Sequence, residues 1–152
     1  MYHLTADGHA QYEKELADLK KKRPEVVVEL SRASELGDRS ENAAYRVAKS
    51  QLGRLDSRIR FLDKMLRHSR IITPKDTGIA GIGSQVRLHG ESGEVTYRLV
   101  DSIQSNLAQG DLSIRSPLGS AILHGKVGSE VSVSTPRGIQ KYTILNVSID
   151  PV

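Results

Sequence analysis

Two heptad-patterned segments on either side of Gly37 constrain the fold more than any other feature of this sequence. In the first segment, apolar residues recur at alternating steps of four and three over residues 12–33, and Arg23 is the single polar member of the series. In the second, they recur at alternating steps of three and four over residues 45–66. Each pattern predicts one face of a coiled-coil helix. Because few residues separate two faces of similar length, we predict an antiparallel helical hairpin.

The predicted helices have recognisable ends. Thr5 has the side chain of an N-cap and Asp7 would complement the helix dipole, so we predict a first helix over residues 6–36. The second helix is predicted over residues 40–68. At ~1.5 Å per residue, each helix would be about 40 Å long.

The hydrophobic period changes after residue 72. Pro74 and Gly78 mark residues 73–78 as a linker. After it, apolar residues alternate with polar ones in short runs, which predicts strands. These runs are Val86/Leu88, Val95/Tyr97/Leu99, Leu112/Ile114, Val131/Val133 and Leu145/Val147/Ile149. Ser116 as cap and Pro117 at the first position predict a short helix over residues 117–124. The predicted fold class is α+β, with a hairpin over residues 1–72 and a small antiparallel-sheet domain over residues 79–152.

Composition limits the possible classes of protein. The chain has no cysteine, which excludes a disulfide framework and a thiolate zinc site. Its five histidines form no close ligand cluster, and no apolar run approaches the ~20 residues that span a bilayer. With no basic-then-apolar leader at the start, we expect a cytoplasmic protein with no membrane contact.

The basic excess lies entirely in the first half of the chain. Residues 1–72 hold 15 Lys and Arg against 11 Asp and Glu, whereas residues 73–152 hold seven of each. The predicted outer side of the second helix carries a basic patch, namely Arg46, Lys49, Arg54 and Arg60. Such a patch could bind an RNA or DNA backbone through phosphates, or it could be a solvated flank of the coiled coil. The pattern leaves both interpretations open.

Several short motifs identify a resemblance to the bacterial Gre transcript-cleavage factors, GreA and GreB. The resemblance covers nearly the whole chain. Its motifs are Leu4-Thr5…Gly8, Lys22-Arg-Pro24, Leu36-Gly-Asp…Glu41-Asn-Ala…Tyr45, Ser116-Pro117, Lys126-Val-Gly128 and Thr135-Pro-x-Gly138. Two positions depart from the family pattern, since Ala44 stands where many relatives have another acid and Ser120 where many have Arg. The subtype, GreA or GreB, stays open.

The resemblance implies a transcription elongation factor rather than an enzyme. Its coiled coil would enter the secondary channel of RNA polymerase, and an FKBP-like C-terminal domain would dock outside the channel through Ser116 and Pro117. There the factor, acting as a monomer, would stimulate the polymerase's own Mg²⁺-dependent cleavage of the RNA 3′ end extruded by backtracking. The basic patch would face that RNA.

Asp38 and Glu41 are the predicted catalytic and metal-binding residues. A two-metal hydrolysis needs one ion for the leaving oxygen and one to lower the pKa of the attacking water. Asp38 would bind an Mg²⁺ ion shared with the polymerase, and Glu41 would position or deprotonate the water. Alone, the two carboxylates cannot form a nuclease centre. A purely structural role also fits, because Asp38-x-x-Glu41 has the spacing of a capping box for the second helix.

Two other functions remain possible. The chain could occupy the channel and inhibit the polymerase without stimulating cleavage, although it has both Asp38 and Glu41. The C-terminal domain could instead be a peptidyl-prolyl isomerase. Residues 73–152 contain only Tyr97 and Tyr142 as aromatic residues, so we expect no aromatic-lined proline pocket.

Overall fold

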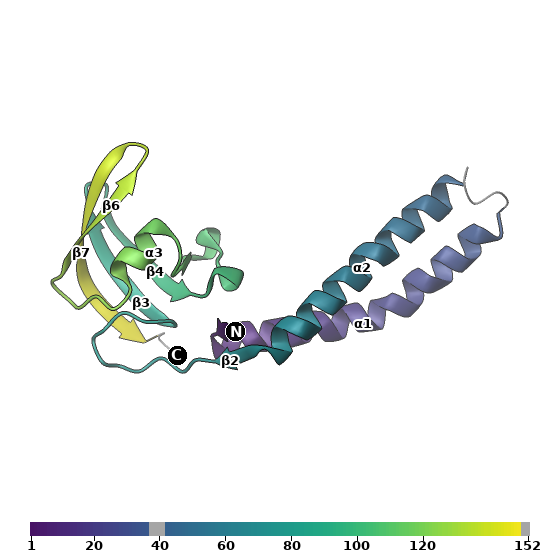
Figure 1. Ribbon diagram of the computed structural model, residues 1–152, viewed down its shortest axis with the longest axis horizontal. Coiled ribbons are helices and arrows are strands. Elements are labelled where there is room, and N and C mark those ends of the chain that lie inside the picture. Colours follow the sequence, from purple (N-terminus) through teal and green to yellow (C-terminus); the bar gives the residue numbers. More distant parts are fainter. Residues whose placement is uncertain (37–41, 150–152) are drawn as a thin grey trace. The chain divides into compact units, whose positions relative to one another are not determined.

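The computed structural model describes residues 1–36 and 42–149. The chain forms two compact units, which are described separately. The hairpin unit consists of His9–His68, and the C-terminal unit consists of Met1–Gly8 together with the residues from Ser69 onward (Figure 1). Residues 1–8, which we assigned to the hairpin from the sequence, are thus grouped with the C-terminal residues. Both units together give the α+β fold class predicted from the two hydrophobic periods.

The hairpin unit contains two long helices that run antiparallel. Helix α1 spans Ala6–Ser34 and helix α2 spans Ala43–Arg67 (Figure 1). Two ion pairs between the helices show their direction. Arg23 on α1 binds Asp56 with an Nε–Oδ1 distance of 2.6 Å, and Arg58 on α2 binds Glu15 with an Nε–Oε1 distance of 2.7 Å. The earlier residue of α1 therefore pairs with the later residue of α2, as in the predicted hairpin.

The predicted apolar seam is the buried face of both helices. Its apolar members are buried or half-buried in the structure. They are Tyr12, Leu16, Leu19, Val26, Leu30 and Ala33 on α1, and Tyr45, Ala48, Leu52, Leu55, Ile59, Leu62 and Leu66 on α2. Arg23, the polar member, keeps 48% of its side chain exposed and reaches Asp56 at the edge of the seam. The heptad reading is confirmed at each of these positions.

The C-terminal unit contains a curved five-stranded sheet and a separate pair of short strands. The sheet has the strand order β5-β4-β3-β7-β6 (Figure 1). Its strands are β3 (Ser84–Gly90), β4 (Gly93–Val100), β5 (Asp111–Ser113), β6 (Glu130–Thr135) and β7 (Gly138–Ile149). Strand β1 (Tyr2–Leu4) pairs in parallel with β2 (Ser69–Ile71). Helix α3 spans Pro117–Ile122.

The sheet is mixed rather than entirely antiparallel as predicted. Strand β5 pairs in parallel with β4, whereas the β3–β4, β3–β7 and β6–β7 pairs are antiparallel. Parallel neighbours need a crossover connection instead of a tight turn. Here the connection carries two short 3-10 helices, Ser102–Gln104 and Leu107–Gln109. The alternation of apolar residues cannot reveal such a connection, because it is the same in both kinds of pairing.

A β-bulge changes which residues of β7 face the core. Arg87 pairs with Asn146 and Leu88 pairs with Ile144, so the register skips Leu145. An extra residue on one strand shifts the alternation by one position. Ile144 is therefore fully buried, while Leu145 is half-buried. The predicted inward run Leu145/Val147/Ile149 is correct at Val147 and wrong at Leu145.

Helix α3 begins as the sequence predicts. Ser116 Oγ accepts a hydrogen bond from the Gly119 backbone N–H at 3.0 Å, and Pro117 occupies the first turn. Ile122 from this helix is fully buried in a cluster with residues from β3, β4, β5 and β7. Ser116 and Pro117 thus start a helix that closes the core of the sheet.

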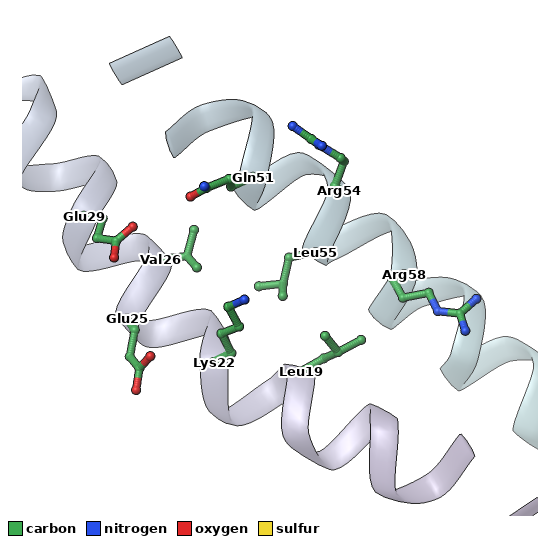
Figure 2. Close-up of a pocket in the computed structure, with 9 residues that line it drawn as sticks. All are labelled: Leu19, Lys22, Glu25, Val26, Glu29, Gln51, Arg54, Leu55 and Arg58. Atoms are coloured by element: carbon green, nitrogen blue, oxygen red, sulfur yellow. The ribbon is translucent and has the colours of Figure 1, made fainter. Parts of the chain in front are cut away.

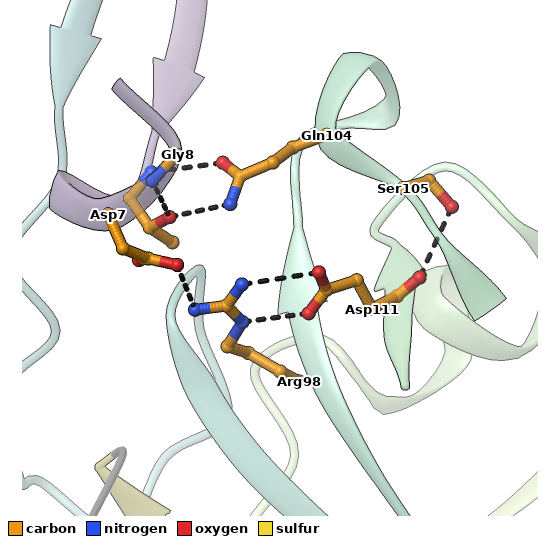
Figure 3. Close-up of polar contacts among 7 residues, drawn as sticks. Asp7, Gly8, Arg98, Gln104, Ser105 and Asp111 are labelled. Atoms are coloured by element: carbon orange, nitrogen blue, oxygen red, sulfur yellow. Dashed lines mark hydrogen bonds and ion pairs between the residues drawn. The ribbon is translucent and has the colours of Figure 1, made fainter. Parts of the chain in front are cut away.

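Within the C-terminal unit, the side chain of Gln104 binds the N-terminal end of α1 (Figure 3). Thr5 is the N-cap as predicted, since its Oγ1 accepts from the Gly8 N–H at 3.2 Å. Gln104 Nε2 donates to the same Oγ1 at 2.6 Å, and the Thr5 N–H donates to Gln104 Oε1 at 3.2 Å. A Cβ on Gly8 would lie 2.5 Å from the Gln104 Cδ. Glycine thus lets the Gln104 amide lie against the first turn of the helix, and a larger residue would have to displace that side chain.

Arg98 on β4 links the same turn to β5 (Figure 3). Its Nε and Nη2 donate to the two Asp111 carboxylate oxygens at 2.8 and 3.2 Å, and its Nη1 donates to Asp7 Oδ2 at 2.9 Å. The hydrogen bonds to Asp111 raise the pKa of Arg98 well above its usual range, with a smaller contribution from Asp7. Burial raises the pKa of Asp7, but the hydrogen bonds from Arg98 and Thr5 and the charge of Arg98 together lower it below 3.8.

The depressed pKa of Asp7 predicts a pH-dependent contribution to stability. Folding favours the charged carboxylate, so this contribution is present above pH 3.8 and is lost as the pH falls through the folded-state pKa. Because 64% of the Asp7 side chain is exposed, we expect only about 0.5 kcal/mol. Urea unfolding of Asp7→Asn should show this loss relative to wild type at pH 7 and almost none near pH 3. An equal loss at both pH values would contradict the prediction.

His124, which follows the last residues of α3, has a left-handed backbone with φ of 67°. Glycine adopts this conformation without the steric cost that a Cβ brings. We expect His124→Gly to raise the free energy of unfolding by about 0.5–1 kcal/mol in urea titrations. Gly128, with φ of 89° and no heavy atom within 4 Å of an added Cβ, is the matched control. Gly128→Ala should lower stability, and a destabilised His124→Gly variant would show the prediction to be wrong.

Candidate functional site

The predicted catalytic residues Asp38 and Glu41 lie outside the described residues. The structure does describe the helix ends that border them. Helix α1 ends at Ser34, and the Glu35 and Leu36 backbone N–H groups donate to carbonyls of its last turn. Helix α2 begins at Ala43, three residues later than the predicted start at residue 40.

Asn42 closes the described hairpin by contacting both helices. Its Oδ1 accepts from the Tyr45 N–H at 3.2 Å, which makes Asn42 the N-cap of α2. Its Nδ2 donates to the Ala33 carbonyl oxygen at 2.5 Å, so the same side chain reaches the last turn of α1. One amide therefore caps the second helix and joins it to the first.

The position of this cap bears on the capping-box hypothesis for Asp38 and Glu41. A box of that spacing would start a helix immediately after Asp38, whereas α2 starts at Ala43 and takes its cap from Asn42. Asn42 therefore supplies an N-cap of α2 from within the described residues, and the roles of Asp38 and Glu41 stay predictions. Asn42 belongs to the motif Leu36-Gly-Asp…Glu41-Asn-Ala…Tyr45, and asparagine is a favoured N-cap residue, so this cap could have been predicted from the sequence. The Asp38-x-x-Glu41 spacing predicted an earlier start of the helix instead.

The four residues of the predicted basic patch are exposed on α2. Arg54 donates to Ser50 Oγ at 3.1 Å and Arg60 to Ser57 Oγ at 3.3 Å. Within the described part of the chain, none of the four patch residues (Arg46, Lys49, Arg54 and Arg60) forms an ion pair with a carboxylate. The patch thus presents cationic groups that no described acid neutralises by direct contact.

Some other cations of the hairpin unit form ion pairs with described acids, unlike the patch residues. Arg58 binds Glu15, and Arg67 binds Asp63 at 2.9 Å. The hydrogen bond from Arg23 lowers the pKa of Asp56, to which the charge of Arg60 contributes at longer range. On α2, Arg58 and Arg67 are therefore paired with carboxylates, whereas the patch residues have no paired acid among the described residues.

A groove of about 470 Å³ runs between α1 and α2 (Figure 2). Its apolar members Leu19, Val26 and Leu55 come from the seam. Figure 2 shows the Lys22 side chain extending from α1 toward the space between the helices, while Arg54 lies on α2. Lys22 belongs to a four-residue cationic run at residues 20–23, and sequence reasoning did not include it in the patch. Its helical position beside Leu19 and Val26 was the available signal.

The predicted docking residues have different exposure. Ser116 is half-buried, and its Oγ donates to the Ser113 carbonyl at 2.7 Å in addition to capping α3. Pro117 is exposed at the first position of the helix. Ser120, also exposed, donates to the Pro117 carbonyl at 3.1 Å. Ser116 therefore holds the local structure, and Pro117 provides accessible surface.

The described residues contain neither a cluster of metal ligands nor a membrane-spanning helix. In residues 1–36 and 42–149, no three histidine or acidic side chains are grouped closely enough to hold a metal ion. The predicted Mg²⁺ ligands lie outside that range. None of the described helices is long and apolar enough to cross a membrane.

Comparison with known proteins places both parts of the chain in one family. Residues 2–71 match the family described as transcription elongation factor, N-terminal, and residues 75–149 match transcription elongation factor, GreA/GreB, C-term. The chain is 40% identical over 146 residues to transcription elongation factor GreA 1 of Lactiplantibacillus plantarum, covering 95% of this chain and 94% of the relative. It is 41% identical over 152 residues to GreB of Xanthomonas axonopodis pv. citri, covering 97% and 89%.

Among solved structures, GreA factor homolog 1 (Gfh1) of Thermus thermophilus aligns with 96% of this chain and 97% of its own, at 23% identity and a TM-score of 0.46. The two family matches and the near-full-length relatives confirm the resemblance drawn from the motifs. This chain belongs to the GreA/GreB family of transcription elongation factors.

Proposed function

We propose that this chain stimulates cleavage of backtracked RNA by RNA polymerase and that Asp38 and Glu41 are the residues responsible. Members of its family are elongation factors that bind RNA polymerase and act through its own cleavage activity, without being enzymes themselves. The finer proposal is that the hairpin unit enters the secondary channel as a monomer. It would bring the two carboxylates to the extruded 3′ end of the RNA.

The cap formed by Asn42 is the observation that carries this proposal. It starts α2 and bonds to Ala33 of α1, and all of these groups lie outside the loop that carries Asp38 and Glu41. With this cap in place, the carboxylates of Asp38 and Glu41 would be available to an external partner. Their retention in a short loop between two long helices is then explained by chemistry rather than by helix stability.

The donor chemistry of these two residues suits Mg²⁺. The ion prefers oxygen ligands, takes few carboxylates from any one protein and retains several waters. Asp38 would hold an ion whose remaining ligands come from the polymerase, and Glu41 would position or deprotonate the attacking water. When bound, the ion would lower the pKa of that water and stabilise the negative charge that develops on the phosphoryl and leaving oxygens.

The basic patch and the docking residues complete the proposal. Exposed cations without a described acidic partner suit the phosphates of the extruded RNA, which would follow α2. Pro117 would contact the polymerase outside the channel, with Ser116 holding α3 in position. RNA guidance and enzyme docking would then lie in different units of the chain.

A channel-binding regulator that inhibits without cleavage is the second candidate. Ala44 favours it, because an exposed alanine stands where many relatives have a further acid. Both functions require binding to the polymerase, but only the first requires the charges of Asp38 and Glu41. Charge-removing substitutions therefore separate the two functions.

We expect Asp38→Asn and Glu41→Gln each to reduce cleavage by a stalled, backtracked complex by roughly two orders of magnitude. Stability should change by less than about 0.5 kcal/mol, since Asn42 supplies the cap of α2. The double variant should still compete with wild type for the polymerase. Glu35→Gln, at an exposed carboxylate before the loop, is the matched control and should cleave normally.

The wild-type chain with Mg²⁺ and free RNA, but without polymerase, should release no product. If Asp38→Asn and Glu41→Gln both stimulate RNA cleavage normally, the two carboxylates have no chemical role. If wild type binds the polymerase and inhibits it without cleavage, the second candidate function is correct.

We expect replacement of the four patch residues by Gln to reduce RNA cross-linking and to slow cleavage in complexes with long extruded RNA. The effect should be several-fold at low salt and should shrink as salt rises, because phosphate contacts are screened. Folding should be unaffected, since these positions lie outside the seam. Arg67→Gln, at an arginine of the same helix that is paired with Asp63, is the control. Equal cleavage by the patch variant and wild type at every salt concentration would favour a solvated flank.

A further inference from the structure

A hollow of about 280 Å³ lies on the sheet of the C-terminal unit, beside the turn between β3 and β4. We call it the tyrosine hollow. Its main lining residues are Val95, Tyr97, Tyr142, Gln140, Glu91 and Glu94. We expected from the sequence that Tyr97 and Tyr142 could not build an aromatic pocket. The structure brings both to one place.

Strand pairing places the two rings on the same face of the sheet. Tyr97 on β4 pairs with the buried Val86 of β3, and Tyr142 on β7 pairs with Val131 of β6. Both tyrosines pack against the apolar core while remaining half-buried. No residue of α3 is among those that line the hollow. The rings therefore form walls at a part of the core face that this helix leaves accessible.

Gly90 at the end of β3 makes room for the Tyr142 ring. A Cβ at this position would lie 2.7 Å from Tyr142 Cε1 and 2.9 Å from Cδ1. The Tyr142 hydroxyl donates to Gln140 Oε1 at 2.9 Å, which fixes the orientation of the ring. The Tyr142 ring is thus held in place by two features: the absence of a side chain at Gly90 on β3 and the hydrogen bond to Gln140 on β7.

The charge of the hollow is uniformly negative. Glu91 and Glu94 line it and are exposed, and no lysine, arginine or histidine is among the lining residues. In the described part of the chain, neither carboxylate forms an ion pair. The faces of phenol rings also attract cations. Strand alternation directs the Glu94 side chain away from the face that carries Tyr97, so Glu91 in the turn and Glu94 at the strand end form a negative rim next to the aromatic walls. This charge favours a positively charged occupant.

We propose that the tyrosine hollow binds an arginine side chain of RNA polymerase. Its volume is at the lower end of small-molecule sites, so it suits one long side chain better than a larger ligand. Guanidinium is planar, stacks on aromatic rings and matches a carboxylate with two parallel hydrogen bonds, whereas an ammonium group is more strongly hydrated. The proposal rests on the family's binding to the polymerase and not on the cleavage role of Asp38 and Glu41.

The first test uses the full chain and a small probe. Nuclear magnetic resonance titration with N-acetyl-arginine methylamide should shift the amide signals of residues 90–97 and 140–142, with a Kd of about a millimolar, as expected for one isolated side chain. The citrulline analogue, which has the same shape without the charge, should bind at least tenfold more weakly. Glu91→Gln with Glu94→Gln should weaken arginine binding about tenfold without affecting the fold, because both residues are exposed.

The second test measures affinity for RNA polymerase. The same double variant should bind the polymerase about tenfold more weakly at low salt, and cleavage at saturating factor should be unchanged. Glu130→Gln is the matched control, because Glu130 is an exposed carboxylate of the same unit that pairs with Lys141 outside the hollow. The variants of Asp38 and Glu41 should lose cleavage but keep normal polymerase binding, whereas the hollow variant should lose affinity but keep cleavage. The two proposals can therefore fail independently.

Several results would overturn the proposal. Equal binding of arginine and citrulline probes would exclude recognition of charge. A response to N-acetyl-proline methylamide instead of arginine would indicate an isomerase-like pocket. Unchanged polymerase affinity of the double variant would exclude the polymerase as the source of the side chain. A self-associated wild type that the double variant converts to monomer would identify a second copy of this chain as the occupant.

Discussion

The apolar seam between α1 and α2 is the constraint on which the hairpin unit depends. Val26, Ala33, Ala48, Leu55 and Leu62 are buried there, and the surrounding helix surface is largely exposed. Burial of apolar area contributes roughly 25 cal/mol for each Å², so a long seam supplies the stabilisation that a globular core supplies elsewhere. Exposed ion pairs contribute about 0–1 kcal/mol each. The cross-helix pairs of Arg23 and Arg58 therefore specify the register of the hairpin more than its stability.

The C-terminal unit uses a partly buried polar network to hold residues from the beginning of the sequence. The Arg98 side chain is only 16% exposed and binds two carboxylates, one of them on Asp7. The His3 N–H donates to Asp101 Oδ2 at 2.9 Å, and Gln104 binds Thr5 through both atoms of its amide. Removing one partner of such a network leaves another polar group buried and unsatisfied, which is costly. The unit therefore depends on its first eight residues as well as on its sheet.

Local features of the sequence were sufficient to predict the seam, the helix caps at Thr5 and Ser116, and most of the strands. Each depends on residues within a few positions of one another. Features that depend on distant residues were missed. The bulge at Leu145 becomes visible only when β3 and β7 are paired, and the contact of Gly90 with Tyr142 joins positions far apart in the chain.

The candidate site also contains features that local sequence predicts and features that depend on distant residues. The basic patch follows from helical periodicity, and its exposure on α2 is confirmed. The cap at Asn42 has a long-range part, because its bond to Ala33 requires the hairpin to be closed. The roles of Asp38 and Glu41 stay predictions, since their chemistry depends on groups that another protein must supply.

The two bonds of Asn42 have a consequence for the evolution of such factors. The closure of the hairpin depends on Asn42, Tyr45 and Ala33, all of which flank the loop at residues 37–41. These bonds and the apolar seam are made by residues outside that loop. Selection can thus exchange the chemical groups carried at the end of the helices without a compensating change in the helices themselves. One hairpin scaffold can in this way carry different loop chemistry.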